Sequence, residues 1–130
     1  MPLIGSSISE SRRESAETGN AIVGFVATAG LLLLVAVTLL SIALTWYVQA
    51  VLVDSASEGA RAGALDGAGV TVAVARTEEL ITTTLPPRYA QDIRASIRGG
   101  QMNVQVNAPS PLSGLIGSRT IEVNAHATLE

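Results

Sequence analysis

Residues whose side chains could carry chemistry are scarce in this sequence. The 130-residue chain has no cysteine and a single histidine, His126. Because protein sites bind transition metals through several imidazole or thiolate ligands, one histidine without cysteine does not predict a metal centre. Asp54 and Asp66 lack the spacing of a calcium-binding loop, and we interpret Glu78-Glu79 as a solvated helix face. We therefore expect no catalytic residue, no metal site and no cofactor, and we interpret His126 as a solvated residue on a strand.

Composition and charge exclude further classes of function. The formal net charge is −3 and the isoelectric point is about 5.1, whereas a surface that binds nucleic acid is basic, so we expect no nucleic-acid partner. Charged residues make up 15% of the chain and hydrophobic residues 48%, while an average soluble protein has about 25% charged residues. Aromatic residues reach only 3%. The surplus of small and aliphatic residues therefore predicts a membrane segment in place of a large soluble core.

That surplus lies in one segment near the N-terminus. No charged residue occurs between Glu17 and Asp54, and most of this interval is continuously apolar. A helix of about 20 residues crosses the hydrocarbon core of a bilayer, so residues 20–48 are predicted to form a transmembrane helix. The alternative, a buried helix of a soluble protein, fails because the remaining ~80 residues cannot surround a helix that is apolar on all sides. Trp46 and Tyr47 stand where an interfacial aromatic anchor is expected.

The length of this segment predicts that it is retained as an anchor, and the charges of its flanks predict its orientation. The apolar run is about twice as long as the 7–15 residues of a cleaved secretory signal, so we interpret it as an anchor. Arg12 and Arg13 precede the span, whereas the first basic residue after it is Arg61. Arginine and lysine concentrate in the cytoplasmic flanks of membrane helices. The N-terminus is therefore expected to be cytoplasmic and the C-terminus extracytoplasmic.

Residues 49–69 are predicted to continue the helix into water as a stalk. Within it, Gly59, Gly63 and Gly67 are four residues apart and share one helical face, a spacing that lets a second helix approach closely. We interpret these glycines as a packing face for a neighbouring helix. An alternative that the sequence leaves open is an alanine-rich stalk whose glycines contact nothing. Gly67-Ala68-Gly69 is predicted to end or bend the helix.

Residues 70–130 are predicted to form a small extracytoplasmic head, which begins with a helix. The first valines of this region alternate as they would in a strand, but a helical face also includes Val70, Val74, Thr77, Ile81 and Leu85. The length of the segment favours a helix over 70–85, and Pro86-Pro87 ends it.

Three segments with alternating apolar and polar residues follow this helix. They cover 93–98, 102–108 and 121–129, and Gly99-Gly100 is a hairpin turn between the first two. Such a sheet is apolar on one face and needs a cover, which the preceding helix can supply. The predicted fold class is α+β: a long N-terminal transmembrane helix extended as a stalk, then a short helix packed on a small three-stranded antiparallel sheet.

The junction in front of the apolar run resembles the class III signal of type IV prepilins. It reads Gly19-Asn20-Ala21-Ile22-Val23-Gly24-Phe25, a glycine and a short neutral stretch before the phenylalanine that opens the long apolar helix. More narrowly, the chain resembles the TadE family of pseudopilins from tight-adherence (Flp) pilus systems. Residues 56–64 resemble the small-residue stretch that follows the span in this family, and residues 104–112 and 121–128 resemble its tail. The resemblance covers residues 18–130 and implies a pilin-like fold.

The resemblance also implies a processing site. Prepilins are cut after the glycine on the cytoplasmic side, so a prepilin peptidase would cleave between Gly19 and Asn20, and residues 1–19 would be a cytoplasmic leader. Gly24 departs from the family, which normally has glutamate at the fifth residue after the cut. In pilins that acid is thought to pair with the new N-terminus of a neighbouring subunit.

We therefore expect a TadE-like minor pseudopilin, a non-enzymatic structural component of a bacterial tight-adherence pilus or a related secretion assembly. It would be anchored in the bacterial cytoplasmic membrane by a single span. Its partners would be the lipid bilayer, other pilins and pseudopilins, the pilus assembly machinery and the prepilin peptidase. The alternative is an unprocessed, single-pass, membrane-anchored accessory or binding protein of the cell envelope.

The distribution of arginines predicts the topology of the chain. Alkaline phosphatase fused after Glu130 should be active, because it acquires its disulfides only in an oxidising compartment. The same reporter fused after Glu17, before the span, should be inactive. Reporter activity in whole cells measures both fusions, and the reverse pattern would rule out the pseudopilin interpretation.

Overall fold

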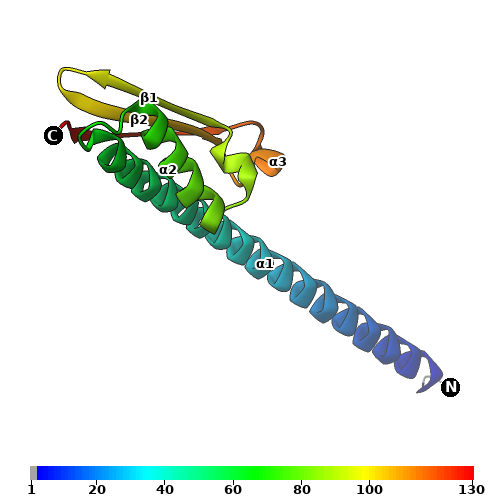
Figure 1. The fold of residues 1–130 in the computed structure, drawn as a ribbon. Coiled ribbons are helices and arrows are strands. Elements are labelled where there is room, and N and C mark those ends of the chain that lie inside the picture. Colours follow the sequence, from blue (N-terminus) through cyan, green and yellow to red (C-terminus); the bar gives the residue numbers. More distant parts are fainter. Residues whose placement is uncertain (1–2) are drawn as a thin grey trace. The chain divides into compact units, whose positions relative to one another are not determined.

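The computed structural model describes residues 3–130, and Figure 1 shows its elements. The helices are α1 (Leu3–Ala64), α2 (Val70–Thr84), the 3-10 helix η1 (Pro87–Ala90) and the short α3 (Ser113–Ile116), and the strands are β1 (Asp92–Arg98), β2 (Gln101–Pro109) and β3 (Thr120–Thr128). A long apolar N-terminal helix, a shorter helix and a three-stranded antiparallel sheet confirm the predicted α+β fold class. The chain divides into two compact units, Met1–Leu40 and Ser41–Glu130. Met1 and Pro2, the first residues of the predicted leader, lie outside the described residues.

The first unit consists of α1 as far as Leu40. Gly19, Gly24 and Gly30 lie inside the helix, and nothing comes within 4 Å of a Cβ atom built on any of them. A glycine in a helix costs about 1 kcal/mol relative to alanine. The helix continues through all three glycines, and alanine, the strongest helix former, lies within three residues of each.

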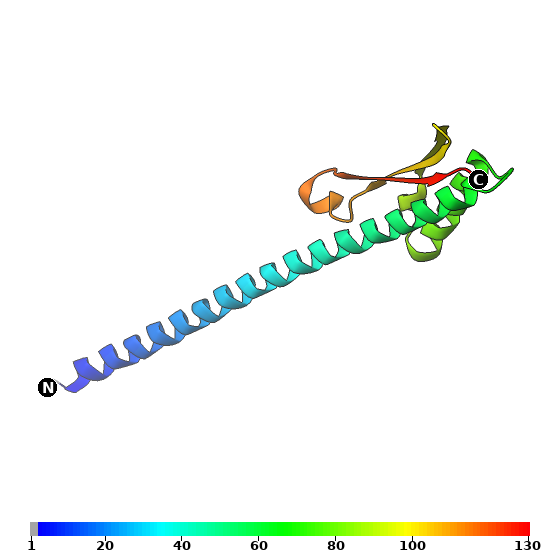
Figure 2. The ribbon, with the colours of Figure 1, turned by 90° about the vertical axis from the view of Figure 1, so that its left-hand side faces the viewer.

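In the second unit, α1 buries one face and ends in a glycine-rich turn. The buried residues recur three and four positions apart, as on one side of a helix: Val48, Leu52, Ser55, Ala56, Gly59, Ala60, Gly63 and Ala64. Gly67 and Gly69 have positive φ angles of 75° and 86°, which only glycine adopts without a steric penalty. The Gly69 amide donates to the Gly63 carbonyl at 3.1 Å and so satisfies the helix end. After this turn, α2 runs back alongside α1 (Figures 1 and 2).

Gly59 and Gly63 lie where α1 contacts α2. A Cβ atom on Gly63 would be 2.5 Å from the Cβ of Ala73, and one on Gly59 would overlap the Oγ1 of Thr77. Gly67 lies outside this contact, in the turn, and nothing comes within 4 Å of its Cβ position. For Gly59 and Gly63, the neighbouring helix is thus α2 of the same chain.

The buried face of α2 is offset from the apolar face that the sequence predicts. Ala73, Thr77 and Ile81 are buried, whereas Val70 is 37% exposed. The Thr77 hydroxyl donates to the carbonyl of Ala73 at 2.8 Å, so its burial leaves no donor unsatisfied. The helix turns toward Ala73 and Thr77 because small side chains at these positions allow close approach to the glycines of α1.

The sheet is an antiparallel meander in the order β1-β2-β3. Val104 of β2 pairs with Ala95 of β1 and with Ala125 of β3. The predicted Gly99-Gly100 hairpin turn is confirmed, with φ angles of 57° and 73° that suit a two-residue turn between twisted strands. Both long helices lie on one face of the sheet (Figures 1 and 2).

One apolar core joins the helices to the covered face of the sheet. Its largest fully buried apolar side chains come from α1, α2 and β2: Leu52, Ile81, Met102, Val104 and Val106. Tyr89 of η1 is only 3% exposed. The guanidinium of Arg88 lies 4.9 Å from the centre of the Tyr89 ring and donates to its hydroxyl at 2.9 Å. Tyr89 thus lies at the border of the aliphatic core, and the helices cover the apolar face of the sheet.

Replacing Gly63 by alanine should lower the free energy of unfolding of the second unit. The added methyl group would meet Ala73 and the backbone of Gly69. Overpacking of this kind costs about 1–3 kcal/mol, which outweighs the gain of about 1 kcal/mol that alanine has over glycine in a helix. The full chain is unfolded with denaturant in mild detergent. The unfolded fraction is measured by proteolytic cleavage at the arginines of the sheet, and its dependence on denaturant gives the change in the free energy of unfolding.

Gly114→Ala is the matched control, because nothing comes within 4 Å of its Cβ position and its φ is not positive. This variant should unfold at the same denaturant concentration as the natural chain or at a slightly higher one, because alanine is favoured over glycine in a helix. If Gly63→Ala were as stable as Gly114→Ala or more so, the two helices would not be in close contact at Gly63.

Candidate functional site

Between residues 21 and 40, the first unit presents an apolar surface on all sides of α1. Val23, Phe25 and Leu33 are 68%, 73% and 66% exposed, and the other leucines of the Leu31–Leu34 run are similarly bare. Among the described residues, one helical segment, Ser7–Ala64 of α1, is long and apolar enough to cross a membrane, and none of its most apolar window is buried by the rest of the chain. A core helix of a soluble protein would be covered. This helix is therefore compatible with a transmembrane helix.

The threonines inside the apolar segment have partners within their own helix. Thr28 and Thr38 donate to the carbonyls of Gly24 and Leu34, each at 2.8 Å. Thr45, at the start of the second unit, donates to the carbonyl of Ser41 at 2.9 Å. A hydroxyl that bonds back to its own helix carries no unmet donor into lipid. These residues therefore do not oppose insertion of the helix into a bilayer.

Gly19 and Asn20, the predicted processing site, lie exposed within α1. Nothing comes within 4 Å of a Cβ atom on Gly19, and the preceding Arg12 and Arg13 are also exposed. No described part of the chain shields this peptide bond from a protease. The bond is helical, however, so cleavage needs local unwinding, which glycine eases by about 1 kcal/mol relative to alanine.

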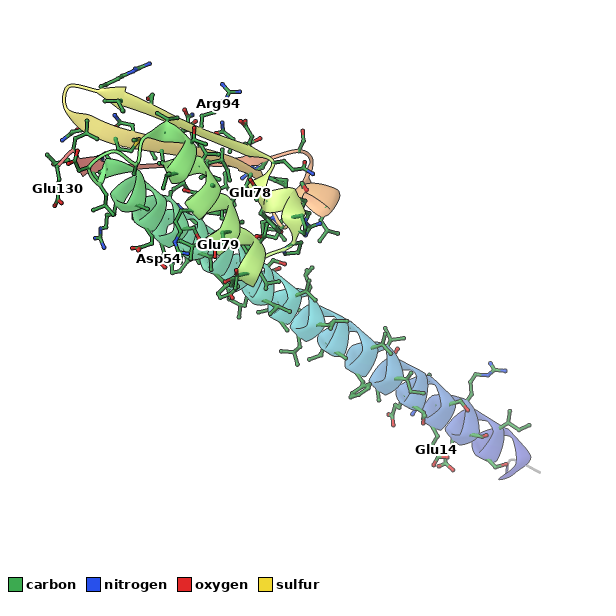
Figure 3. All side chains as sticks on the ribbon, in the orientation of Figure 1. Glu14, Asp54, Glu78, Glu79, Arg94 and Glu130 are labelled. Atoms are coloured by element: carbon green, nitrogen blue, oxygen red, sulfur yellow. The ribbon has the colours of Figure 1, made fainter. Side chains whose placement is uncertain are left out.

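The polar face of the sheet has its own hydrogen-bond network. Gln105 donates to Glu122 at 2.9 Å, and Asn107 and Arg94 both donate to Asp92 at 3.1 Å. Figure 3 shows Arg94 pointing away from α1 and α2. Sequence alternation placed these residues on the solvated face, but it did not reveal the pairs, because they depend on the register between strands. Several side chains of this face are thus engaged with one another.

The residues first considered for chemistry lie apart from one another. His126 is exposed on β3 opposite Asn103, while Asp54 and Asp66 are exposed at different positions along the chain. In the part of the chain that the structure describes, no three histidine, aspartate or glutamate residues gather as metal ligands would.

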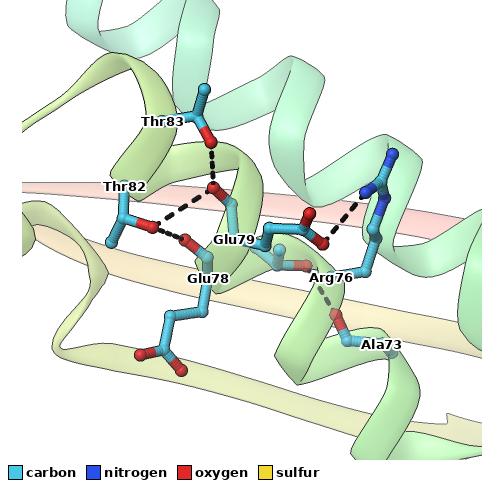
Figure 4. Close-up of polar contacts among 7 residues, drawn as sticks. Ala73, Arg76, Glu78, Glu79, Thr82 and Thr83 are labelled. Carbon is cyan, nitrogen blue, oxygen red and sulfur yellow. Dashed lines mark hydrogen bonds and ion pairs between the residues drawn. The ribbon is translucent and has the colours of Figure 1, made fainter.

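The acidic pair of α2 takes part in local contacts only. Glu79 accepts from Arg76 at 3.0 Å, one turn away on the same helix (Figure 4). The hydroxyls of Thr82 and Thr83 donate to backbone carbonyls of this turn. Glu78 is exposed. This arrangement stabilises a helix surface, and it matches the interpretation of the pair as a solvated face.

The loop between β2 and β3 contains a feature that sequence reasoning missed. Residues 110–119 hold the short helix α3, and Leu115 on it is 79% exposed. In the sequence this stretch reads as a turn, because it contains Pro111 and Gly117. The sequence signal that could have drawn attention to it is the pair Leu115-Ile116, since loops are usually made of small, polar, glycine and proline residues.

The first unit thus exposes an apolar helical segment, and the second unit is a packed α+β head whose sheet has a polar outer face. An exposed apolar helix of this length is compatible with membrane anchoring. Comparisons of the chain with protein-family models, with curated proteins and with solved structures found no match.

Proposed function

We propose that this chain is a TadE-like minor pseudopilin, a structural subunit of a bacterial tight-adherence pilus or a related secretion assembly. One observation carries the proposal: α1 is bare and apolar in the first unit, and in the second unit the same helix is packed into a small α+β head. This layout is consistent with that of pilins, in which an N-terminal helix serves both as the membrane anchor and as the spine of the head.

Each segment has a role in this proposal. Residues 1–19 are the cytoplasmic leader, and prepilin peptidase cuts between Gly19 and Asn20. Residues 20–48 hold the subunit in the cytoplasmic membrane and pack against the helices of other pilins. The head contacts further subunits or the assembly machinery on the extracytoplasmic side. The exposure of Gly19 and of the arginines before it supports access by the peptidase.

The glycine at position 24 makes this a partner-dependent subunit. Nothing comes within 4 Å of a Cβ atom there, so the structure leaves room for the glutamate that the resemblance leads one to expect. A buried carboxylate in lipid is costly unless it is paired. Without one, the subunit has neither that cost nor the charged pair that fixes the register of subunits in a homopolymer.

A second candidate function is an unprocessed membrane-anchored accessory protein of the cell envelope. The continuous helix through Gly19 and Asn20 favours it, because an intact helix resists proteolysis. In this case the arginine-bearing N-terminal turns of α1 stay attached to the span. The two functions differ in a property that is simple to measure, the length of the mature chain.

Co-expression with a cognate prepilin peptidase should shorten the chain to one that begins at Asn20. Gly19→Leu should prevent this, because a bulky side chain before the cut both blocks the peptidase and strengthens the helix. Gly30→Leu is the matched control: it also replaces an open helical glycine, but it lies away from the junction and should leave cleavage intact. Intact mass and N-terminal sequencing give the result, and a chain that stays full length with active peptidase would favour the unprocessed anchor.

Expressed as the only pilin, with the assembly ATPase and the peptidase, the chain should form no filaments. The expected reason is the missing acid at position 24, so Gly24→Glu should increase self-association, while Gly24→Gln, of similar size without charge, should not. Electron microscopy of sheared surface fractions and cross-linking in membranes measure the two effects. Long filaments of the natural chain alone would contradict the assignment as a minor subunit.

A further inference from the structure

The loop between β2 and β3 is a built structure that holds one leucine outward. The Ser110 amide donates to the Arg119 carbonyl at 2.8 Å, which closes the base of the loop. The Ser113 amide donates to the Ser110 carbonyl at 3.0 Å, and the Leu115 amide to the Leu112 carbonyl at 2.9 Å. Ser110 itself is buried. These bonds fix the backbone that carries Leu115, the most exposed large apolar side chain among the described residues.

The base of this loop lies beside the Ser41 end of α1. A depression in the second unit is lined both by Thr45 of α1 and by Leu112, Gly117 and Ile121 of the loop and the strand after it. Figures 1 and 2 agree, because α3 lies at the end of the sheet opposite to the C-terminus. The other end of the sheet is fixed near Ala64, whose carbonyl accepts from the Glu130 amide at 3.1 Å.

Around Thr45, the helix surface has the character of a membrane interface. Leu44 is 46% exposed, Trp46 72% and Tyr47 51%. One turn later Val48 is buried, and from there the helix packs into the head. Tryptophan and tyrosine prefer the headgroup level of a bilayer. The loop that carries Leu115 therefore lies at the end of the head where the exposed aromatic residues of α1 stand.

The charge of the loop fits a lipid surface as well. Residues 93–121 contain no acidic residue, and Arg119 at the base of the loop is exposed. An apolar side chain that enters the acyl boundary, together with a cation at the headgroup phosphates, is the usual composition of an interfacial anchor. In water, by contrast, nothing offsets the free-energy cost of holding the apolar leucine side chain exposed.

We propose that the β2–β3 loop is a second membrane contact of this chain, in which Leu115 enters the outer leaflet and Arg119 lies at the headgroup phosphates. The inference rests on the proposed function only in requiring that the apolar part of α1 spans a bilayer. With two attachment points, the head and the part of α1 packed in it are held at one tilt, and the sheet keeps one orientation toward the membrane surface. Extraction of the subunit from the membrane must then release the loop as well as the helix.

The absence of natural cysteines allows a direct measurement of depth. A nitroxide label on Gly114→Cys, where an added Cβ meets nothing within 4 Å, reports on the loop with Leu115 intact. The full chain is reconstituted in vesicles of phosphatidylcholine and phosphatidylglycerol. Collisions of the label with oxygen, which concentrates in lipid, are compared with collisions with a water-soluble nickel chelate. Leu44→Cys is the reference for lipid, and Leu65→Cys, 56% exposed beyond the end of α1, is the reference for water.

The label at position 114 should have an oxygen-to-nickel ratio several-fold above that at 65 and close to that at 44. Adding Leu115→Ser should return the ratio to the value at 65, whereas Leu65→Ser in the same Gly114→Cys background should leave it unchanged. A ratio at 114 equal to that at 65, or shielding from both reagents by protein, would overturn the proposal, as would a ratio unchanged by Leu115→Ser. If the label at 44 is itself in water, the transmembrane anchor and the loop contact both fail; if only 114 is in water, the loop contact alone fails.

Discussion

The close contact between α1 and α2 at Gly59 and Gly63 is the interaction on which the head depends. The face of α1 that enters the core is made mostly of glycine, alanine and serine, so it offers little apolar area for each residue. Such a face contributes to stability only when the partner helix comes near enough for many atoms to be in van der Waals contact. A methyl group at Gly63 would already meet Ala73, which shows that no spare distance remains. The turn at Gly67 and Gly69 follows from this, because α2 must begin beside α1.

The sheet depends on the same pair of helices. Its covered face consists of valine, isoleucine, alanine and methionine side chains, and three strands of such residues are only marginally stable alone. The helices cover this face, while the other face has hydrogen bonds such as those from Gln105 to Glu122 and from Asn107 to Asp92. The covered face thus contributes apolar side chains to the core, whereas the outer face helps to fix the register between strands through polar pairs.

Much of this fold follows from the sequence, because its periodicities are local. Alternation predicts all three strands, and Gly99-Gly100 predicts the hairpin that joins the first two. The offset of the α2 face toward Ala73 was not predictable, since valine at 70 is the more apolar residue and only the glycines of another element make Ala73 the better contact. Of the candidate site, the apolar helix could be predicted from composition. The processing junction came only from resemblance. The interpretation of Leu115 depends on the position of its loop, whose base lies beside Thr45, and no local sequence pattern contains that position.

These features together determine which part of the chain can recognise a specific partner protein. Within the apolar stretch, the hydroxyls of Thr28 and Thr38 are engaged by their own helix, and position 24 carries no acid. If this stretch spans a bilayer as proposed, its lateral packing there is left with van der Waals contact between apolar side chains, which many helices can offer equally well. Polar and shape-specific groups lie instead in the second unit, on the outer face of the sheet and on the exposed side of α1 near Asp54 and Glu58. If this chain selects one partner among several similar membrane helices, the selection has to be made by its head.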